Sequence, residues 1–303
     1  MVVAYIVCYV CGALAILGGW IVESTNTTML LYGIGFAFLV AGLIVQIIKS
    51  KIDKSENRQH ITRLTQQAES GDAEAQYKLG REYLDGYGVR KNYKRAFYWC
   101  MQSAEQGHVL AQSIVGLCYY FGRGVKQDYN QALYWSSKSA EQGFAIAQRT
   151  LGNCYYFGYG VKQDYKKAVY WYTKSAEQGE DTAQFNLGAC YYDGNGIAQD
   201  YKKAVYWYAK SATQGNANAQ CSFGYCYEKG YGVEKDTSKM IYWYTKSAEQ
   251  GNETAQYNLG NCYYYGFGVA KNSQLAKRWY TESAKQGYYS AKKALHEKFN
   301  TSV

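Results

Sequence analysis

The sequence predicts an all-α fold, an α-solenoid of helical hairpin repeats preceded by a two-helix transmembrane hairpin. Two stretches, KQDYKKAVYWYTKSAEQG from position 162 and AQDYKKAVYWYAKSATQG from position 198, are nearly identical. Alanine and tryptophan positions return throughout the later chain at intervals of 36 residues, whereas the first fifty residues carry only Glu23 and Lys49 as charges. A unit copied at a fixed period is typical of modules that are stable only beside their neighbours.

Residues 1–49 are predicted to form the membrane hairpin, because the stretches 2–22 and 29–48 each hold the roughly 20 apolar residues that cross a bilayer. A cleavable signal peptide is the alternative for the first stretch. Its leading residues lack Lys and Arg, however, and a second apolar stretch follows at once. Small residues spaced four apart favour packing between the two helices, with self-association between chains as the other possibility.

Charges beside the second stretch predict its orientation. Glu23 is the only charged residue in the loop before this stretch. Five basic residues follow the stretch, namely Lys49, Lys51, Lys54, Arg58 and Arg63. The positive-inside rule places this basic flank on the cytoplasmic side. We therefore expect a multi-pass protein of the inner (cytoplasmic) membrane, with the repeat domain in the cytoplasm.

Residues 73–288 are predicted to contain six units of 36 residues, each a pair of helices. The second helix begins at an Asp or Asn that can cap it, such as Asp128, and ends at a Gly such as Gly143. A turn with two glycines closes the first helix and permits positive φ. The first helix also carries a mid-helix glycine such as Gly152, which predicts a neighbouring helix too close for a Cβ.

Large and small residues on the second helix predict how the hairpins interlock. Ala132, Trp135 and Ala140 return in the other units, and we expect the tryptophan rings to fill the gaps between neighbouring hairpins. Partial units flank the array. The segment 50–72 is predicted to be a basic juxtamembrane stretch with an N-terminal capping helix, and 289–303 a C-terminal capping helix that covers the last apolar face.

The pattern A-Q-x-x-L-G-x-x-Y, then G-x-G-V, then D-Y-x-x-A-x-x-W-Y-x-K-S-A-x-Q-G resembles the Sel-1-like repeat of the tetratricopeptide superfamily. The resemblance covers about 75–287 and implies a right-handed, TPR-like solenoid that works as an adaptor between proteins. Secreted relatives bridge each hairpin with two cysteines. This chain has one cysteine per repeat, with Cys100 and Cys221 in addition, which agrees with a reducing compartment.

No cofactor or metal is expected. Cys118 and its copies recur one whole unit apart, beyond disulfide reach, and are predicted to be small buried residues. The three histidines are scattered, and no phosphate-binding glycine loop is present. Some relatives have been linked to penicillin binding or β-lactamase activity, and Ser290 with Lys293 forms one S-x-x-K. Because no SDN or KTG accompanies it, we do not expect an enzyme.

The first helix has a constant face and a variable face, and the variable face is the candidate binding surface. In related solenoids this helix lines the concave side. Exposed Tyr, Asn and Arg are typical of protein-binding surfaces, although a tyrosine-rich groove without a partner is the alternative. The candidate residues are Tyr77, Arg81, Leu117, Tyr120, Arg149, Asn153, Tyr156, Phe185, Tyr192, Tyr225, Glu228, Tyr257, Asn261 and Tyr264.

These observations predict a membrane-anchored scaffold or adaptor that binds a protein or peptide in the concave groove. The alternatives are an extracytoplasmic or host-directed binding protein and, less favoured, a β-lactamase or penicillin-binding enzyme. Of the formal charge of +9, residues 1–63 carry five basic against three acidic residues, and the remaining +7 is spread thinly, mostly over the second helices. Nucleic-acid partners, which select for dense basic clusters, are therefore not expected.

Overall fold

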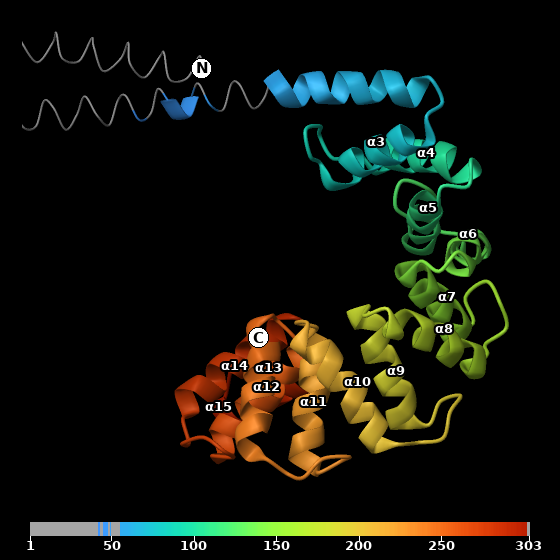
Figure 1. Cartoon of the computed structure of the whole chain (residues 1–303). Helices are drawn as coiled ribbons and strands as arrows, with labels where there is room; N and C mark the ends of the chain where they lie inside the picture. The colour runs from blue at the N-terminus through green and yellow to red at the C-terminus, as the bar shows by residue number, and fades with distance from the viewer. Residues whose placement is uncertain (1–41, 43–44, 48, 50–54, 302–303) are drawn as a thin grey trace, which may run out of the picture. The chain divides into compact units, whose positions relative to one another are not determined.

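The computed structural model describes residues 42, 45–47, 49 and 55–301, and all regular structure in these residues is helical (Figure 1). The predicted spans 2–22 and 29–48 lie outside the described residues, apart from the few positions between 42 and 47. Within the part of the chain that is described, no helix combines the length and apolarity needed to cross a bilayer. The membrane hairpin over 1–49 therefore stays a prediction.

The chain divides into two compact units, residues 1–92 and 93–303. In the first unit, a helix over 55–69 is followed by α3 (Ala73–Asp85). The Asp72 side chain caps α3 by accepting the Ala75 N–H at 2.8 Å. The buried Gln76 amide of α3 donates to the Ala68 carbonyl of the preceding helix at 3.1 Å, which fastens the two helices together.

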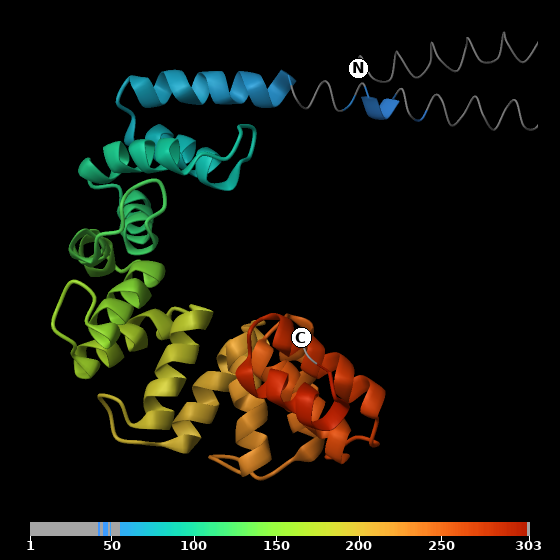
Figure 2. The same ribbon diagram turned by 180° about the vertical axis from the view of Figure 1, so that it is seen from behind.

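The second unit begins with α4 (Tyr93–Glu105), continues through five helical hairpins and ends with α15 (Tyr289–Phe299). From α4 to α15 each helix packs against the next one in the chain, so the hairpins stack side by side, as Figures 1 and 2 both show. The hairpins are α5 (Val109–Phe121) with α6 (Tyr129–Glu141), α7 (Ala145–Phe157) with α8 (Tyr165–Glu177), α9 (Asp181–Asp193) with α10 (Tyr201–Thr213), α11 (Ala217–Lys229) with α12 (Thr237–Glu249), and α13 (Glu253–Tyr265) with α14 (Ser273–Lys285).

The helix ends lie where the sequence predicts them. The second helices α8, α10, α12 and α14 each begin after an Asp or Asn whose side chain accepts the backbone N–H three residues later, at 2.9–3.0 Å. Each first helix ends at a left-handed glycine, for example Gly158 with φ 73°. The second glycine of the same turn, Gly160 with φ 68°, lies so close to the Tyr129 carbonyl of the preceding hairpin that a Cβ would overlap it. Gly158 is therefore required by its left-handed backbone conformation, and Gly160 by the lack of space for a Cβ beside Tyr129.

The mid-helix glycines are confirmed as points of close approach, and in four hairpins the side chain that fills the space is a tyrosine of the second helix. A Cβ on Gly152 would lie 2.6 Å from the Tyr172 ring. The same pairing joins Gly188 to Tyr208, Gly224 to Tyr244, and Gly260 to Tyr280. Trp135 is buried, whereas Trp171, Trp207, Trp243 and Trp279 are only half-buried.

These four rings pack against the cores between neighbouring hairpins, as predicted, but they are only half-buried there, and the reason is geometric. Tyr172 follows Trp171 directly and is turned about 100° around the helix axis from it. This direction points into the hairpin, toward the glycine, so the tyrosine ring takes the central position. Trp171 packs instead at the edge of the core formed by Ala140, Ala147 and Leu151.

Pairs of glutamines, one buried in a first helix and one exposed at the end of a second helix, connect the helices of the stack. Gln184 of α9 donates to the Ala176 carbonyl of α8 at 3.1 Å and accepts a hydrogen bond from Gln214 of α10 at 2.8 Å. Equivalent pairs recur along the stack, for example Gln178 with Gln148 at 2.7 Å. Because a buried amide without partners destabilises a fold, the invariance of this glutamine is explained by these bonds.

Candidate functional site

The variable faces of the first helices border two adjoining clefts in the second unit. One cleft, of about 370 Å³, has Tyr192, Asp193 and Tyr208 on one side and residues of α11 and α13 on the other. The second cleft, of about 710 Å³, lies between α11 and α13. Tyr225 and Asn258 line both clefts, so the two form one groove, which we call the α9–α13 groove.

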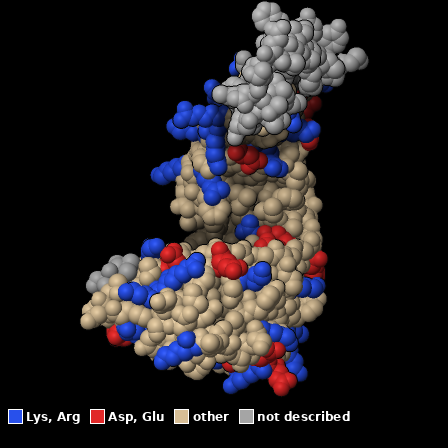
Figure 3. All heavy atoms as spheres, turned by 90° about the vertical axis from the view of Figure 1, so that its left-hand side faces the viewer, with Lys and Arg blue, Asp and Glu red and all other residues tan. Residues whose placement is uncertain are grey.

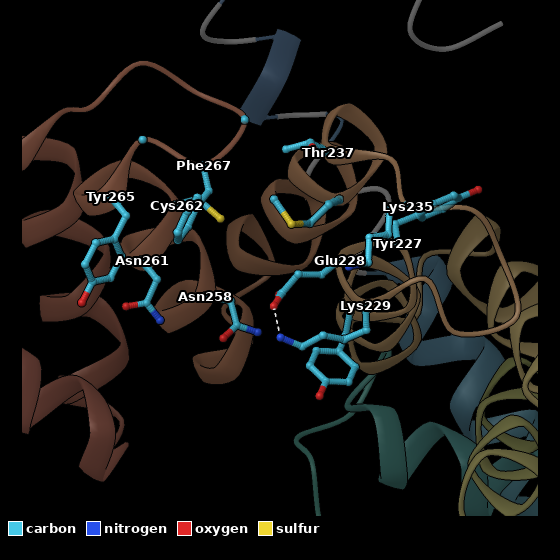
Figure 4. A pocket seen from close by; sticks show the side chains of 14 residues that line it. Tyr227, Glu228, Lys229, Lys235, Thr237, Asn258, Asn261, Cys262, Tyr265 and Phe267 are labelled. Atoms are coloured by element: carbon cyan, nitrogen blue, oxygen red, sulfur yellow. Dashed lines mark ion pairs between the residues drawn. The ribbon is translucent and has the colours of Figure 1, made fainter.

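The side chains of the larger cleft come from both of its walls, as Figure 4 shows. Glu228 and Lys229 belong to α11 and form an ion pair with each other. Asn258 and Asn261 face them from α13, and Phe267 comes from the turn that follows α13. This lining combines an apolar ring, two amides that can form hydrogen bonds and a carboxylate paired with a lysine.

The structure brings four of the predicted binding residues into this groove and places the other ten elsewhere along the array. Tyr192, Tyr225, Glu228 and Asn261 line the two clefts. In the first unit, Tyr77 and Arg81 line a separate surface hollow with Asp85 and Tyr87. The remaining eight lie on the first helices of the second unit, namely Leu117, Tyr120, Arg149, Asn153, Tyr156, Phe185, Tyr257 and Tyr264.

Exposure of the candidate residues differs from the expectation, since all are half-buried except Arg81, which is exposed. Contacts between hairpins explain this burial. The Tyr120 ring lies 5.6 Å from Tyr129 and 5.8 Å from Tyr159, and the latter two rings stack at 4.3 Å. The Tyr156 hydroxyl accepts a hydrogen bond from Asn195 at 3.0 Å. Tyr120 and Tyr156 therefore help to hold neighbouring hairpins together, and neither of them lines the α9–α13 groove.

Polar candidate residues are tied to the buried tyrosines of the second helices. Tyr172 donates its hydroxyl to Asn153 at 2.7 Å, and Asn186 donates to the same oxygen at 3.2 Å. Tyr280 donates to Asn261 at 2.7 Å, and Tyr244 to Glu228 at 2.7 Å. The sequence gives no sign of these bonds, because the partners lie 16 to 33 positions apart.

An ion pair bridges two hairpins beside the groove. Arg149 Nε lies 2.9 Å from Glu180 Oε1, and the two side chains are 17% and 13% exposed. Burial raises the pKa of Glu180, while Arg149 and the Ala183 N–H oppose that rise. Glu180 also caps α9 through the same Ala183 N–H, so Arg149 has a structural partner and is not free for a ligand.

Sequence reasoning missed several groove residues. Asn258 shares a repeat position with Ser222 on the variable face, so its place was open to prediction from the same helical projection. Lys235 and Phe267 line the larger cleft from turns rather than helices. The period of a helix does not say where a turn residue points, so no pattern could have found them.

The cysteines of the repeat are buried and free, as predicted. Burial raises the pKa of Cys154 to about 12, and that of Cys190 equally. A thiol with such a pKa is a poor nucleophile near neutral pH. No cluster of His, Cys, Asp and Glu in the described residues is arranged to hold a metal ion. Lys293 of the S-x-x-K sequence forms an exposed ion pair with Glu297 at 3.8 Å.

Charges on the repeats are mixed in sign. In the lower half of Figure 3, Lys and Arg lie interspersed with Asp and Glu on a mostly uncharged face. Several lysines lie over tyrosine rings of their own helix, for example Lys210, whose Nζ is 4.7 Å from the centroid of Tyr206. This pattern differs from the dense basic stripe on which nucleic-acid binding depends.

Stacked helical hairpins with a groove along their first helices define an α-solenoid, the class that includes the tetratricopeptide-like arrays. The chain belongs to the Sel1 repeat family, whose model matches residues 73–108, 109–144, 145–180, 181–216, 217–252 and 254–288. Sel1 repeat proteins are in general non-enzymatic scaffolds for protein–protein interaction.

Two solved structures of Sel1 repeat proteins resemble the chain. One is c5321, a protective antigen present in uropathogenic Escherichia coli strains, with 39% identity, a TM-score of 0.67, and coverage of 78% of this chain and 52% of that one. The other is a Sel1 repeat protein from Oxalobacter formigenes, with 36% identity, a TM-score of 0.66, and coverage of 72% and 89%. The chain thus spans about half the length of the E. coli protein. No curated protein matches the sequence.

Proposed function

We propose that the protein is a membrane-anchored scaffold that binds a protein or peptide partner in the α9–α13 groove, on the cytoplasmic side of the inner membrane. The observation that carries the binding role is the groove itself, two adjoining clefts of about 370 and 710 Å³ between the first helices of successive hairpins. Its tyrosine rings offer large contact area at a low entropic cost, and its amides can bond to a peptide backbone.

Anchoring and topology rest on the sequence. The apolar stretches 2–22 and 29–48 support two membrane helices, and the basic residues after them support a cytoplasmic array. Small residues spaced four apart in both stretches support packing of the two membrane helices against each other, with self-association between chains as the alternative.

The groove is tested by a double variant, Tyr225→Ala with Asn258→Ala. Both residues line both clefts, so we expect capture of a crosslinked partner to fall at least tenfold, the loss expected for a central contact residue. Capture is measured by quantitative mass spectrometry of crosslinked membranes. The matched control is Tyr206→Ala with Lys202→Ala, which removes an exposed ring and an exposed polar side chain from α10.

The helical circular dichroism and the unfolding midpoint of the groove variant should stay close to those of the control. Equal capture by both variants would contradict the groove as the binding site.

An extracytoplasmic, host-directed binding protein is the second candidate function, favoured by similarity to an antigen of uropathogenic E. coli. Topology separates the two functions. We expect green fluorescent protein fused after the last residue to fluoresce and alkaline phosphatase at the same position to be inactive, because the first matures in the cytoplasm and the second in the periplasm. The reverse pair of results would move the array outside and reject the cytoplasmic scaffold.

A further inference from the structure

Near the end of α15, the side chain of Lys298 lies among three tyrosine rings. Its Nζ is 4.3 Å from the ring centroid of Tyr264, 4.5 Å from that of Tyr265 and 5.1 Å from that of Tyr280. It also donates a hydrogen bond to the Tyr280 hydroxyl at 3.1 Å. An ammonium group held against several aromatic faces is a cation–π site. The α13–α14 hairpin thus binds a lysine of the chain itself.

The same position two repeats earlier forms a site without a lysine. The residues 72 positions before the three tyrosines are Tyr192, Asp193 and Tyr208, and all three line the smaller cleft of the α9–α13 groove. Asp193 replaces a tyrosine with a carboxylate, which attracts a cation more strongly. The position that corresponds to Lys298 is held by Cys226, which is buried and uncharged.

The Tyr208 hydroxyl has no hydrogen-bond partner among the described residues, although its counterparts do. Tyr172 and Tyr280 donate to Asn153 and Asn261, which occupy one repeat position. In the α9–α10 hairpin that position is Ala189, which has no polar side-chain atom. The Tyr208 hydroxyl can accept a hydrogen bond from a ligand, as the Tyr280 hydroxyl accepts one from Lys298, and its own proton is available to the ligand as well.

The other described hairpins do not offer this combination. In α11–α12 the equivalent residues are Glu228 and Lys229, which pair with each other. In α7–α8 the equivalent of Asp193 is Phe157, which has no carboxylate, and in α5–α6 the equivalent of the central tyrosine is Ser136. The smaller cleft is thus the one place among the described repeats where two tyrosine rings, a carboxylate and a free hydroxyl converge.

We propose that the cleft lined by Tyr192, Asp193 and Tyr208 binds the side chain of a lysine in the partner peptide, in the way that the α13–α14 hairpin binds Lys298. The proposal rests on the peptide-binding function proposed above and adds the chemical requirement for one ammonium group. Charge supports it, because Asp193 supplies a local negative site on a chain whose formal charge is +9 and which would otherwise repel basic peptides.

The test selects binders from a random peptide library displayed on phage, using the full chain in detergent micelles. The tightest-binding peptide that contains a lysine is then synthesised in two forms, one with that lysine and one with norleucine in its place. Norleucine has a similar length but no charge. We expect the norleucine peptide to bind wild type about tenfold more weakly, the loss expected for a partly desolvated cation–π contact. Titration calorimetry gives the two dissociation constants.

Variants locate the effect. Asp193→Asn and Tyr208→Leu should each bind the lysine peptide more weakly. Each should also lose most of the preference for lysine over norleucine, because a contact already removed from the protein side cannot be lost again from the peptide side. Glu177→Gln, which neutralises an exposed carboxylate at the end of α8, is the matched charge control and should keep the full preference. Circular dichroism establishes that each variant is folded.

The outcomes distinguish the two proposals. Equal affinity of the protein for the lysine and norleucine forms of the peptide would reject the lysine site and leave the groove intact. A preference for lysine that survives in Asp193→Asn would do the same. A library without any binder, together with unchanged partner capture by Tyr225→Ala with Asn258→Ala, would reject the groove as well. A preference lost in Asp193→Asn and kept in Glu177→Gln supports the site.

Discussion

Replacing Tyr244 with alanine is expected to lower the free energy of unfolding by about 3–5 kcal/mol, the range for removing a large buried ring. The ring is completely buried, packs against Gly224, and donates its hydroxyl to Glu228 at 2.7 Å. Its removal leaves a cavity inside the α11–α12 hairpin and takes away the hydrogen-bond donor of Glu228 Oε2. Urea unfolding followed by circular dichroism measures the change.

The matched variant is Trp243→Ala, at the neighbouring position of the same helix. Trp243 is the larger side chain but is only half-buried, so its loss should destabilise the protein clearly less than the loss of Tyr244. The opposite order would show that the tryptophans, as the sequence predicts, fill the main gaps in the stack.

Alkaline pH is expected to destabilise the array steeply. Burial raises the pKa of Cys154, Cys190 and Cys226 to about 12, compared with an ordinary value of 9.0. Above pH 9.0 the thiols of the unfolded chain release protons that the folded state retains, so stability is complete below pH 9.0 and falls as pH rises toward 12. Each such thiol contributes a loss of about 1.4 kcal/mol per pH unit in this window.

The measurement is urea unfolding in a reducing buffer at neutral pH and at several values above pH 9.0. A variant with Cys154→Ala and Cys190→Ala removes two titrating groups, so its stability should decline by about 3 kcal/mol less per pH unit than that of the wild type. Parallel decline of the two proteins would show that the buried thiols do not cause the alkaline loss. Wild type and variant are compared by slope, so the variant's own packing loss does not enter.

The candidate site shows where sequence reasoning stops. Helical projection correctly placed Tyr192, Tyr225, Glu228 and Asn261 on the variable face, and these residues line the groove. It also predicted exposed tyrosines, whereas Tyr120 and Tyr156 are half-buried between hairpins. Projection of a single helix gives the direction of a side chain but not the distance to the next helix. That distance decides whether a tyrosine is exposed or packed between two hairpins.

The sequence by itself determined the units of this protein. Capping residues such as Asp164, turn glycines such as Gly158 and the period of 36 residues are local signals, and each fixes backbone conformation within a few positions along the chain. Only the tertiary structure decided that Tyr172 rather than Trp171 fills the centre of its hairpin, and that Ala189 leaves the Tyr208 hydroxyl without a partner among the described residues. These features depend on how closely two helices approach and on hydrogen bonds between residues of different helices. The spacing of residues within one helix determines neither of them.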